Sequence, residues 1–221
     1  MGKKLLFVLL VLSLFAGMSH AALITGVDRS GGNSGDRAWV GAFDGEMDPA
    51  VTSLADGVMV FMDREYPLAN TPAELIGADY VQTFNTDKNG GTWDVTYAVT
   101  LGEAAILAVT CDDRIPLPDE WDNDGAFTTQ QQAVDAVVAG FAAAGVFEDT
   151  GLDIFVREKE DGSRDRPMSV YAAAMPAGTY VFGAQPSGRN FYQIGATPIP
   201  EPATIALLGL GGLALIRRKR S

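Results

Sequence analysis

Short stretches of alternating apolar and polar residues, separated by turns rich in Gly, Asn and Asp, run through most of the chain. The clearest is 93–101, where every second residue is apolar. Because successive side chains of a strand point to opposite faces, this stretch predicts a strand with one buried face. The short segment 102–104 predicts a hairpin-like connection to the next apolar run, 105–111. Comparable runs predict strands at 22–27, 38–43, 57–62, 80–84, 152–157, 169–174, 178–183 and 190–196.

One segment, 128–144, has a helical composition instead. Thr128 or Thr129 would cap its N-terminus, and Gly145 would follow its C-terminus. Many short strands and one amphipathic helix together predict a mainly β fold, an antiparallel β-sandwich of jelly-roll type with the helix over a sheet. The apolar residues at helical spacing are Val134, Val137, Val138 and Phe141.

The N-terminal end, 1–21, differs from this pattern. Lys3 and Lys4 precede an unbroken apolar run at 5–15, and Ser19 and Ala21 place small residues at −3 and −1 of a cleavage site. This order of features is typical of a secretory signal peptide, so signal peptidase is expected to cut after Ala21. The alternative is a retained N-terminal membrane anchor.

The C-terminal end, 199–221, combines three features. The triplet Pro200, Glu201 and Pro202 interrupts regular structure. The uncharged run 203–216 follows; as a helix it would reach about 21 Å, against a hydrocarbon core of about 30 Å. It is therefore a marginal span and is expected to be a short transmembrane segment. The alternative, a buried core helix, fits its glycines and terminal cations poorly. The apolar residues expected in the membrane are Ile205, Leu207, Leu208, Leu210, Leu213, Leu215 and Ile216. The basic residues expected to stop the segment on the cytoplasmic side are Arg217, Arg218, Lys219 and Arg220.

The triplet, the apolar run and the Arg-rich terminus together resemble the PEP-CTERM sorting tail of Gram-negative bacteria. The resemblance implies recognition by an exosortase, a membrane enzyme similar to cysteine proteases, and processing near Pro200–Pro202. It also implies transient insertion into the inner membrane and export to the cell surface or extracellular matrix, often in cells that make exopolysaccharide. It covers only this end of the chain and implies nothing about the activity of the central domain, 22–198.

The central domain is strongly acidic. Six of the 16 basic residues and one of the 28 acidic residues lie in the two ends, which leaves 10 basic and 27 acidic residues and a formal charge of −17. Such a surface disfavours nucleic acid and anionic lipid as partners. It suits cations, neutral glycans or solubility outside the cell.

Histidine and cysteine usage excludes several chemistries. The one histidine, His20, lies in the expected signal peptide, so the exported domain would contain none. A Ser-His-Asp triad, a Cys-His pair and a His-ligated zinc or haem are therefore excluded there. Cys111 is the only cysteine, so it forms no internal disulfide. It follows an apolar run and is expected to be a small buried residue rather than a reactive thiol.

Two short stretches, 85–90 and 120–125, resemble the first half of a calcium loop. Each places oxygen-bearing side chains at alternate positions before a glycine, but Thr96 and Gln131 stand where the bidentate acid would be. Calcium would thus need ligands from elsewhere, and a solvated Asx-rich turn is the simpler alternative. No other cofactor is expected. The possible calcium ligands are Asn85, Asp87, Asn89, Asp122 and Asp124.

A third set of polar residues follows the run 105–111. Asp112, Asp113 and Arg114, with the nearby Trp121, form a possible ligand-binding group. Asp112 or Asp113 with Glu120 could serve a glycosidase, although a domain with so many acids always offers some such pair. The charge run 158–167 is expected to be an exposed hairpin loop.

The sequence leaves three functions open. The first is a surface or matrix protein without catalytic activity, structural or associated with exopolysaccharide. The second is a lectin-like carbohydrate-binding module, assisted by calcium. The third is a secreted glycan hydrolase without histidine.

Overall fold

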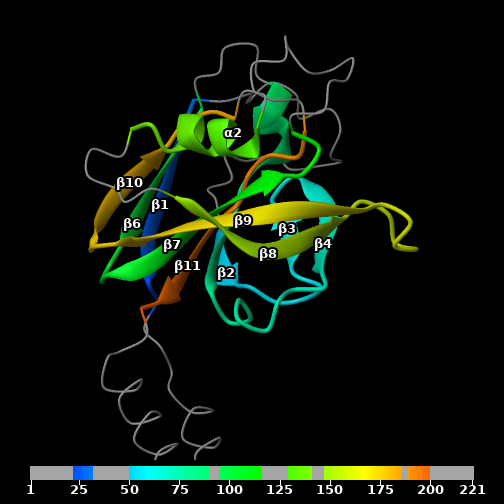
Figure 1. Ribbon diagram of the computed structural model, residues 1–221, viewed down its shortest axis with the longest axis horizontal. Helices are drawn as coiled ribbons and strands as arrows, with labels where there is room; N and C mark the ends of the chain where they lie inside the picture. Colours follow the sequence, from blue (N-terminus) through cyan, green and yellow to red (C-terminus); the bar gives the residue numbers. More distant parts are fainter. Residues whose placement is uncertain are drawn as a thin grey trace, which may run out of the picture.

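The computed structural model describes residues 22–31, 50–89, 95–115, 129–140, 147–185 and 189–199 (Figure 1). Within these ranges the fold is mainly β, with one α-helix and one short 3-10 helix. The strands are β1 (Ile24–Ser30), β2 (Ala50–Ser53), β3 (Met59–Phe61), β4 (Arg64–Ala69), β5 (Asp79–Gln82), β6 (Thr96–Leu101), β7 (Ala105–Asp112), β8 (Glu148–Arg157), β9 (Asp165–Met175), β10 (Gly178–Phe182) and β11 (Ile194–Pro198). The helices are η2 (Asn85–Asn89) and α2 (Gln130–Val137).

The strands form two sheets, and within each sheet neighbouring strands pair in the antiparallel direction. One sheet has the order β1-β6-β10, and the other has the order β2-β5-β11-β7-β9-β8-β4-β3. A parallel bridge joins Phe61 to Thr83, and the N–H of Met62 donates to the carbonyl of Thr83 at 2.9 Å. This bridge brings β3, at one edge of the larger sheet, back to the end of β5. The eight-stranded sheet is therefore curled on itself.

The predicted hairpin over 102–104 is wrong. The strand β6 pairs with β1 and β10, whereas β7 pairs with β9 and β11 in the other sheet. The chain changes layer at this turn, where the N–H of Gly102 donates to the carbonyl of Leu23 at 2.9 Å. Alternation reports which face of a strand is buried but does not report which strand lies beside it.

Most other predicted strands are confirmed with shifted ends. The charge run does connect β8 to β9 as a hairpin, closed by the N–H of Glu158 on the carbonyl of Arg164 at 2.9 Å. The strands β2 and β4 were not predicted, because β2 has four residues and β4 contains Pro67. The predicted strand at 38–43 lies outside the described residues. So do the predicted signal peptide and the sorting tail from Pro200 onwards.

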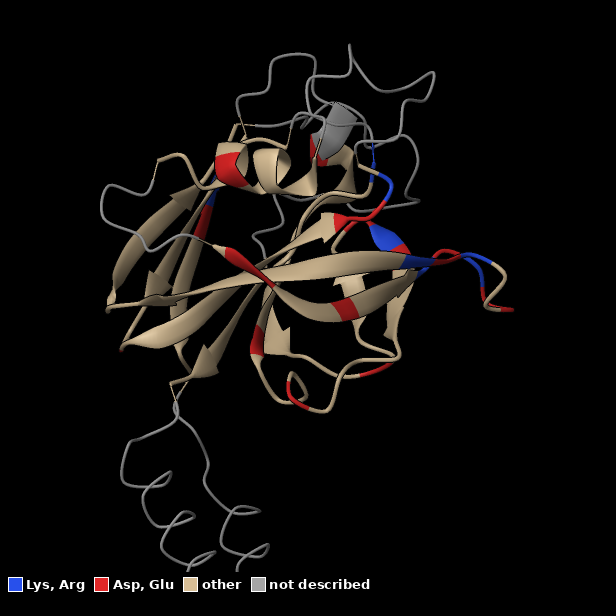
Figure 2. Cartoon of the chain, viewed as in Figure 1, with Lys and Arg blue, Asp and Glu red and all other residues tan. Residues whose placement is uncertain are grey.

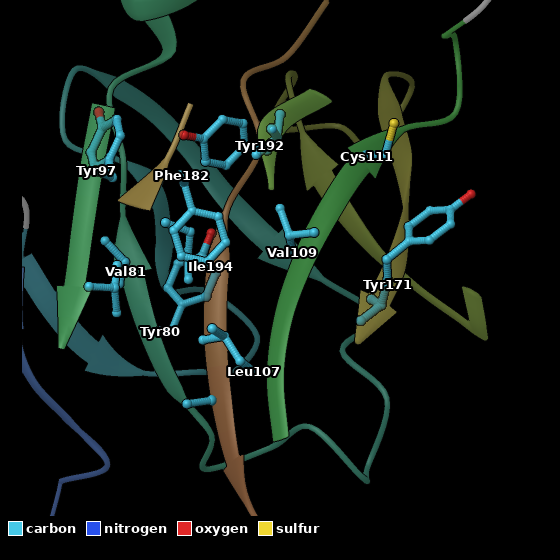
Figure 3. Close-up of a cluster of buried hydrophobic side chains, with 14 of the residues drawn as sticks. Tyr80, Val81, Tyr97, Leu107, Val109, Cys111, Tyr171, Phe182, Tyr192 and Ile194 are labelled. Carbon is cyan, nitrogen blue, oxygen red and sulfur yellow. The ribbon is translucent and has the colours of Figure 1, made fainter. Parts of the chain in front are cut away.

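An aromatic cluster fills the space between the two sheets (Figure 3). Tyr97 comes from β6 and Phe182 from β10, while Phe191 and Tyr192 precede β11. The rings of Phe191 and Tyr192 stack at 4.2 Å, and Tyr192 lies 6.2 Å from Tyr97 and 6.1 Å from Phe182. The predicted buried face of β6 is confirmed within the described residues: Val95, Tyr97, Val99 and Leu101 are all buried.

The helix α2 is shorter than its composition predicts. Thr129 caps it, and its hydroxyl accepts from the N–H of Gln132 at 3.3 Å. Ala133, Val134 and Val137 are buried, and the helix contacts β7. It ends at Val137, whose carbonyl has no partner within the helix and accepts from the N–H of Gly183 at 2.7 Å. In the part of the chain that is described, no helix is long and apolar enough to cross a membrane.

Candidate functional site

The polar group predicted after β7 divides between two environments. Asp112 is the last residue of β7, and its side chain has no exposed surface. The guanidinium of Arg114 donates to both of its oxygens, from Nε to Oδ1 at 2.9 Å and from Nη2 to Oδ2 at 2.5 Å. The backbone N–H of Arg114 also donates to Oδ1 at 2.9 Å, and that of Asn190 donates to Oδ2 at 3.2 Å. The buried carboxylate is thus fully satisfied by the protein.

The hydrogen bonds of Arg114 continue to the hairpin between β8 and β9. Its Nη2 lies 3.4 Å from Oε1 of Glu158, which also accepts from Nδ2 of Asn190 at 3.1 Å. The other oxygen of Glu158 accepts from Nε of Arg166 at 3.1 Å. We call Asp112, Arg114, Glu158, Arg166 and Asn190 the Arg114 network. Arg166 and Arg114 are its more exposed members, so its guanidinium edges are accessible from solvent.

Asp113 turns to the face covered by α2. Its Oδ1 accepts from the N–H of Ser169 at 2.9 Å, from Oγ of Ser169 at 2.6 Å and from Nε2 of Gln130 at 2.9 Å. Gln130 begins the helix, and its Oε1 accepts from the hydroxyl of Tyr171 at 3.3 Å. Asp113 therefore fastens the first turn of α2 to β9.

Three titratable groups near Asp113 have raised pKa values. Burial raises the pKa of the Cys111 thiol to about 12, and the carboxylates of Asp112 and Asp113 add to the effect. Burial, followed by the neighbouring Cys111, raises the pKa of Tyr171 to about 12 as well. The pKa of Asp153 is also raised, mainly by burial and then by the charge of Asp113. At neutral pH the thiol is protonated and buried, so a nucleophilic role for Cys111 is not supported.

The remaining members of this predicted ligand group lie outside the described residues. They are Glu120 and Trp121, together with the possible calcium ligands Asp122 and Asp124. Of this predicted group, the structure therefore places Asp112, Asp113 and Arg114 at one strand end.

The first predicted calcium stretch folds as the 3-10 helix η2 rather than as an open loop. Asp87 is buried, and both of its oxygens accept hydrogen bonds from the guanidinium of Arg29. The hydroxyl of Tyr97 donates to the same carboxylate at 2.5 Å. The Arg29 guanidinium in turn lies 4.7 Å from the centre of the Phe84 ring. A cation at Asp87 would have to displace Arg29.

The side chain of Asn85 is also occupied by a hydrogen bond within the protein. Its Oδ1 accepts from the N–H of Phe191 at 3.0 Å. Asp63 caps the start of η2, because its two oxygens accept from the N–H groups of Asn85 at 2.7 Å and Thr86 at 2.9 Å. Among the described residues, no three His, Cys, Asp or Glu side chains gather as a metal site. The calcium assignment stays a prediction, now centred on Asp122 and Asp124.

Sequence reasoning missed the partners of these acids. Arg29 lies 58 residues before Asp87, and Asn190 lies 78 residues after Asp112. No sequence motif identifies such pairs, because nothing near Arg29 or Asn190 in the sequence indicates which acid it will contact. One local signal existed: Asp87 comes soon after β5 and Asp112 ends β7, and an acid at the end of a buried strand needs a partner.

Comparison with known proteins identifies one segment of the chain. The PEP-CTERM protein-sorting motif matches residues 198–220. The chain therefore carries this motif, as its C-terminal pattern indicated, and the motif implies export and processing by an exosortase, a membrane protein. No curated protein matches the chain.

Two solved structures resemble the domain only distantly. A β-glucuronidase from glycoside hydrolase family 2 is 18% identical at a TM-score of 0.49, over 72% of this chain and 14% of that one. A GH138 enzyme targeting pectin rhamnogalacturonan II is 10% identical at a TM-score of 0.40, over 68% of this chain and 15% of that one. The chain thus spans about a seventh of each enzyme's length, and neither likeness carries an argument about its activity.

Proposed function

We propose that this protein is an exosortase substrate whose domain, 22–198, is displayed at the cell surface or in the extracellular matrix and does not itself catalyse a reaction. The observation that carries the proposal is the position of the motif. It begins at Pro198, the last residue of β11, and β11 lies between β5 and β7 in the larger sheet. The sorting signal is therefore joined directly to the folded domain. Cleavage near Pro200–Pro202 would release the domain with all of β11 attached.

The chemistry of the described residues supports a non-catalytic role. Asp87 and Asp112 are both buried, and arginines neutralise them. Asp113 accepts three hydrogen bonds from the protein, and Cys111 is protonated at neutral pH because of its raised pKa. The three carboxylates are thus occupied by interactions inside the domain. We also propose that the two sheets belong to a jelly-roll-like β-sandwich, which would suit display because it is compact and antiparallel.

The sorting role is tested by replacing Pro200, Glu201 and Pro202 with alanine in the native host. We expect the variant to accumulate in the inner membrane with its apolar run attached, while the wild-type chain reaches the surface. Intact mass spectrometry of the exported protein should also give an N-terminus at Ala22. The matched control replaces Lys159 and Glu160 with alanine, two exposed residues of the hairpin between β8 and β9. Normal surface display of the Pro200–Pro202 variant would contradict the proposal.

Carbohydrate binding by the same domain is a second candidate. The observation that favours it is the Arg114 network, in which partly exposed guanidinium groups, a carboxylate and an amide lie side by side. Such planar polar groups can pair with sugar hydroxyls. A glycan array, run with calcium and then with a chelator, tests this candidate. Binding that is lost in Arg166→Ala would favour it, whereas turnover of any polysaccharide would favour a hydrolase instead.

A further inference from the structure

Both ends of the described chain leave the molecule on one side. Pro198 pairs with Ala105 at the start of β7, while Ile24 pairs with Leu101 at the end of β6. The turn 102–104 joins those two positions, and Figure 1 shows β1 and β11 leaving the domain together. The turn between β9 and β10 and the turn before β5 lie at the same end. We call residues 22–24, 75–78, 102–104, 176–177 and 197–199 the exit face.

The exit face differs in chemistry from the opposite end of the domain. Ile76 is 59% exposed and Ile199 is 40% exposed, so two of the five exposed large apolar residues among those described lie there. No described lysine or arginine lies on this face (Figure 2). The described basic residues lie toward the other end, near the hairpin of β8 and β9, the end of β7 and the start of η2. Those whose side chains the structure describes are Arg29, Arg64, Arg114, Arg157, Lys159, Arg164, Arg166 and Arg189, and Lys88 belongs to η2.

The position of the sorting motif limits how the domain can be oriented. Five residue steps separate Pro198, paired in β11, from Ala203, where the uncharged run begins. Even a fully extended chain covers at most about 3.6 Å per step, or about 18 Å in all. A domain of this size has a radius of about 20 Å, and the headgroup layer adds about 5–8 Å. A domain lying on its side would hold the end of β11 beyond this reach.

We propose that, while the tail is inserted, the exit face lies against the lipid surface, with Ile76 and Ile199 in contact with the headgroup region. This proposal rests on the proposed sorting function and adds the orientation of the domain to it. The hairpin of β8 and β9 and the Arg114 network then point away from the membrane. The exit face carries no described cation and one exposed acid, Glu103, so its contact with lipid depends on apolar burial and gains nothing from anionic headgroups.

The experiment uses the full chain reconstituted in vesicles of phosphatidylethanolamine and phosphatidylglycerol. In a Cys111→Ala background, Ala177→Cys places a fluorophore on the exit face and Ser163→Cys places one on the hairpin; both positions are exposed. Lipids with a nitroxide on the headgroup serve as the quencher. We expect strong quenching at position 177 and none at position 163. Replacing the phosphatidylglycerol with phosphatidylcholine should preserve or increase this difference, because it removes anionic headgroups that repel Glu103 and the acidic domain.

A second pair of variants tests the apolar contact. Ile76→Ser should reduce the quenching at position 177. Met59→Ser should not, although it also replaces an exposed apolar residue with serine, because Met59 lies on β3 outside the exit face and is 43% exposed. Equal quenching at positions 163 and 177 in chains that are inserted would overturn the orientation alone. Quenching that appears only when an exosortase is added would also overturn it, because the exit face would then contact protein. Failure of the chain to insert would contradict the sorting function itself.

Discussion

One buried ion pair links the smaller sheet of this domain to the 3-10 helix that follows β5 of the larger sheet. Arg29 belongs to β1 of the smaller sheet, and Asp87 follows β5 of the larger one. Their ion pair, with the hydroxyl of Tyr97 on the same carboxylate, crosses from one sheet to the other. Because Asp87 is buried, removing its charge leaves the guanidinium without its partner in a poorly hydrated place.

We expect Asp87→Asn to lower the free energy of unfolding by about 3 kcal/mol, the lower end for breaking a buried ion pair. In a domain of this size that loss corresponds to a fall in Tm of about 10 °C. Thermal denaturation measures it, with the exposed Glu160→Gln as the matched control that should stay within about 0.5 kcal/mol of the wild type. A Tm unchanged in Asp87→Asn would mean that the ion pair contributes no stability.

Cys111 offers a second residue-scale prediction. Its pKa is raised from 9.0 to about 12, mainly by burial, so at pH 8 the native thiol should react with iodoacetamide about a thousandfold more slowly than in denaturant. The unfolded chain loses this proton at lower pH than the native one, so stability should fall as the pH rises from about 9 towards 12. Cys111→Ala should remove that part of the fall. Rapid labelling of the folded protein would disprove the buried assignment.

At the scale of elements, capping decides local structure where composition alone was ambiguous. The stretch 85–90 has the side chains of half a calcium loop, but Asp63 accepts its first two N–H groups and a 3-10 helix forms. The helix places Asp87 toward Arg29 rather than toward solvent. An acid 22 residues away thus determines how this stretch folds.

Removal of this cap should have a measurable cost. Asp63→Ala leaves two backbone donors of η2 without acceptors, and we expect a loss of about 1–2 kcal/mol in unfolding free energy. Asp161→Ala is the control, because Asp161 accepts a similar bond from the N–H of Ser163 in an exposed turn where water can replace it. Urea denaturation compares the two variants. Equal losses would show that the cap of η2 has no special role.

At the scale of the whole molecule, acidic charge dominates the surface. The domain between the two expected cleavage points has a formal charge of −17, and its described cations gather at the end away from the exit face (Figure 2). Because carboxylates are in excess, any added cation is expected to stabilise the domain by screening their mutual repulsion. A specific cation site has to be distinguished from this general effect.

The predicted calcium site at Asp122 and Asp124 should be weak, with a Kd of about 10⁻⁴–10⁻³ M. At a tenfold excess over Kd, calcium would stabilise the domain by about 1.4 kcal/mol, which raises Tm by about 3–5 °C. Magnesium should do much less, because it requires tighter octahedral geometry. Asp122→Ala should abolish the shift. Equal small shifts with calcium, magnesium and sodium at matched ionic strength would indicate screening alone.

The sequence by itself determined the features that depend on neighbouring residues. Alternation in β6 correctly predicted its buried face, Thr129 correctly predicted the start of α2, and the C-terminal triplet with its apolar run and cations correctly predicted the sorting motif. Each of these is a local pattern, since strand faces, caps and sorting signals are defined within a few residues.

Tertiary structure alone decided which strands pair and which partners the acids find. The turn 102–104 changes sheet instead of closing a hairpin, and the partners of Asp87 and Asp112 include Arg29 and Asn190, far away in the sequence. A periodic pattern indicates that a residue is buried, but it does not indicate which residues cover it. The orientation of the exit face likewise follows from where β11 ends within the folded sheet, because only the fold brings that strand end beside the turns that surround it.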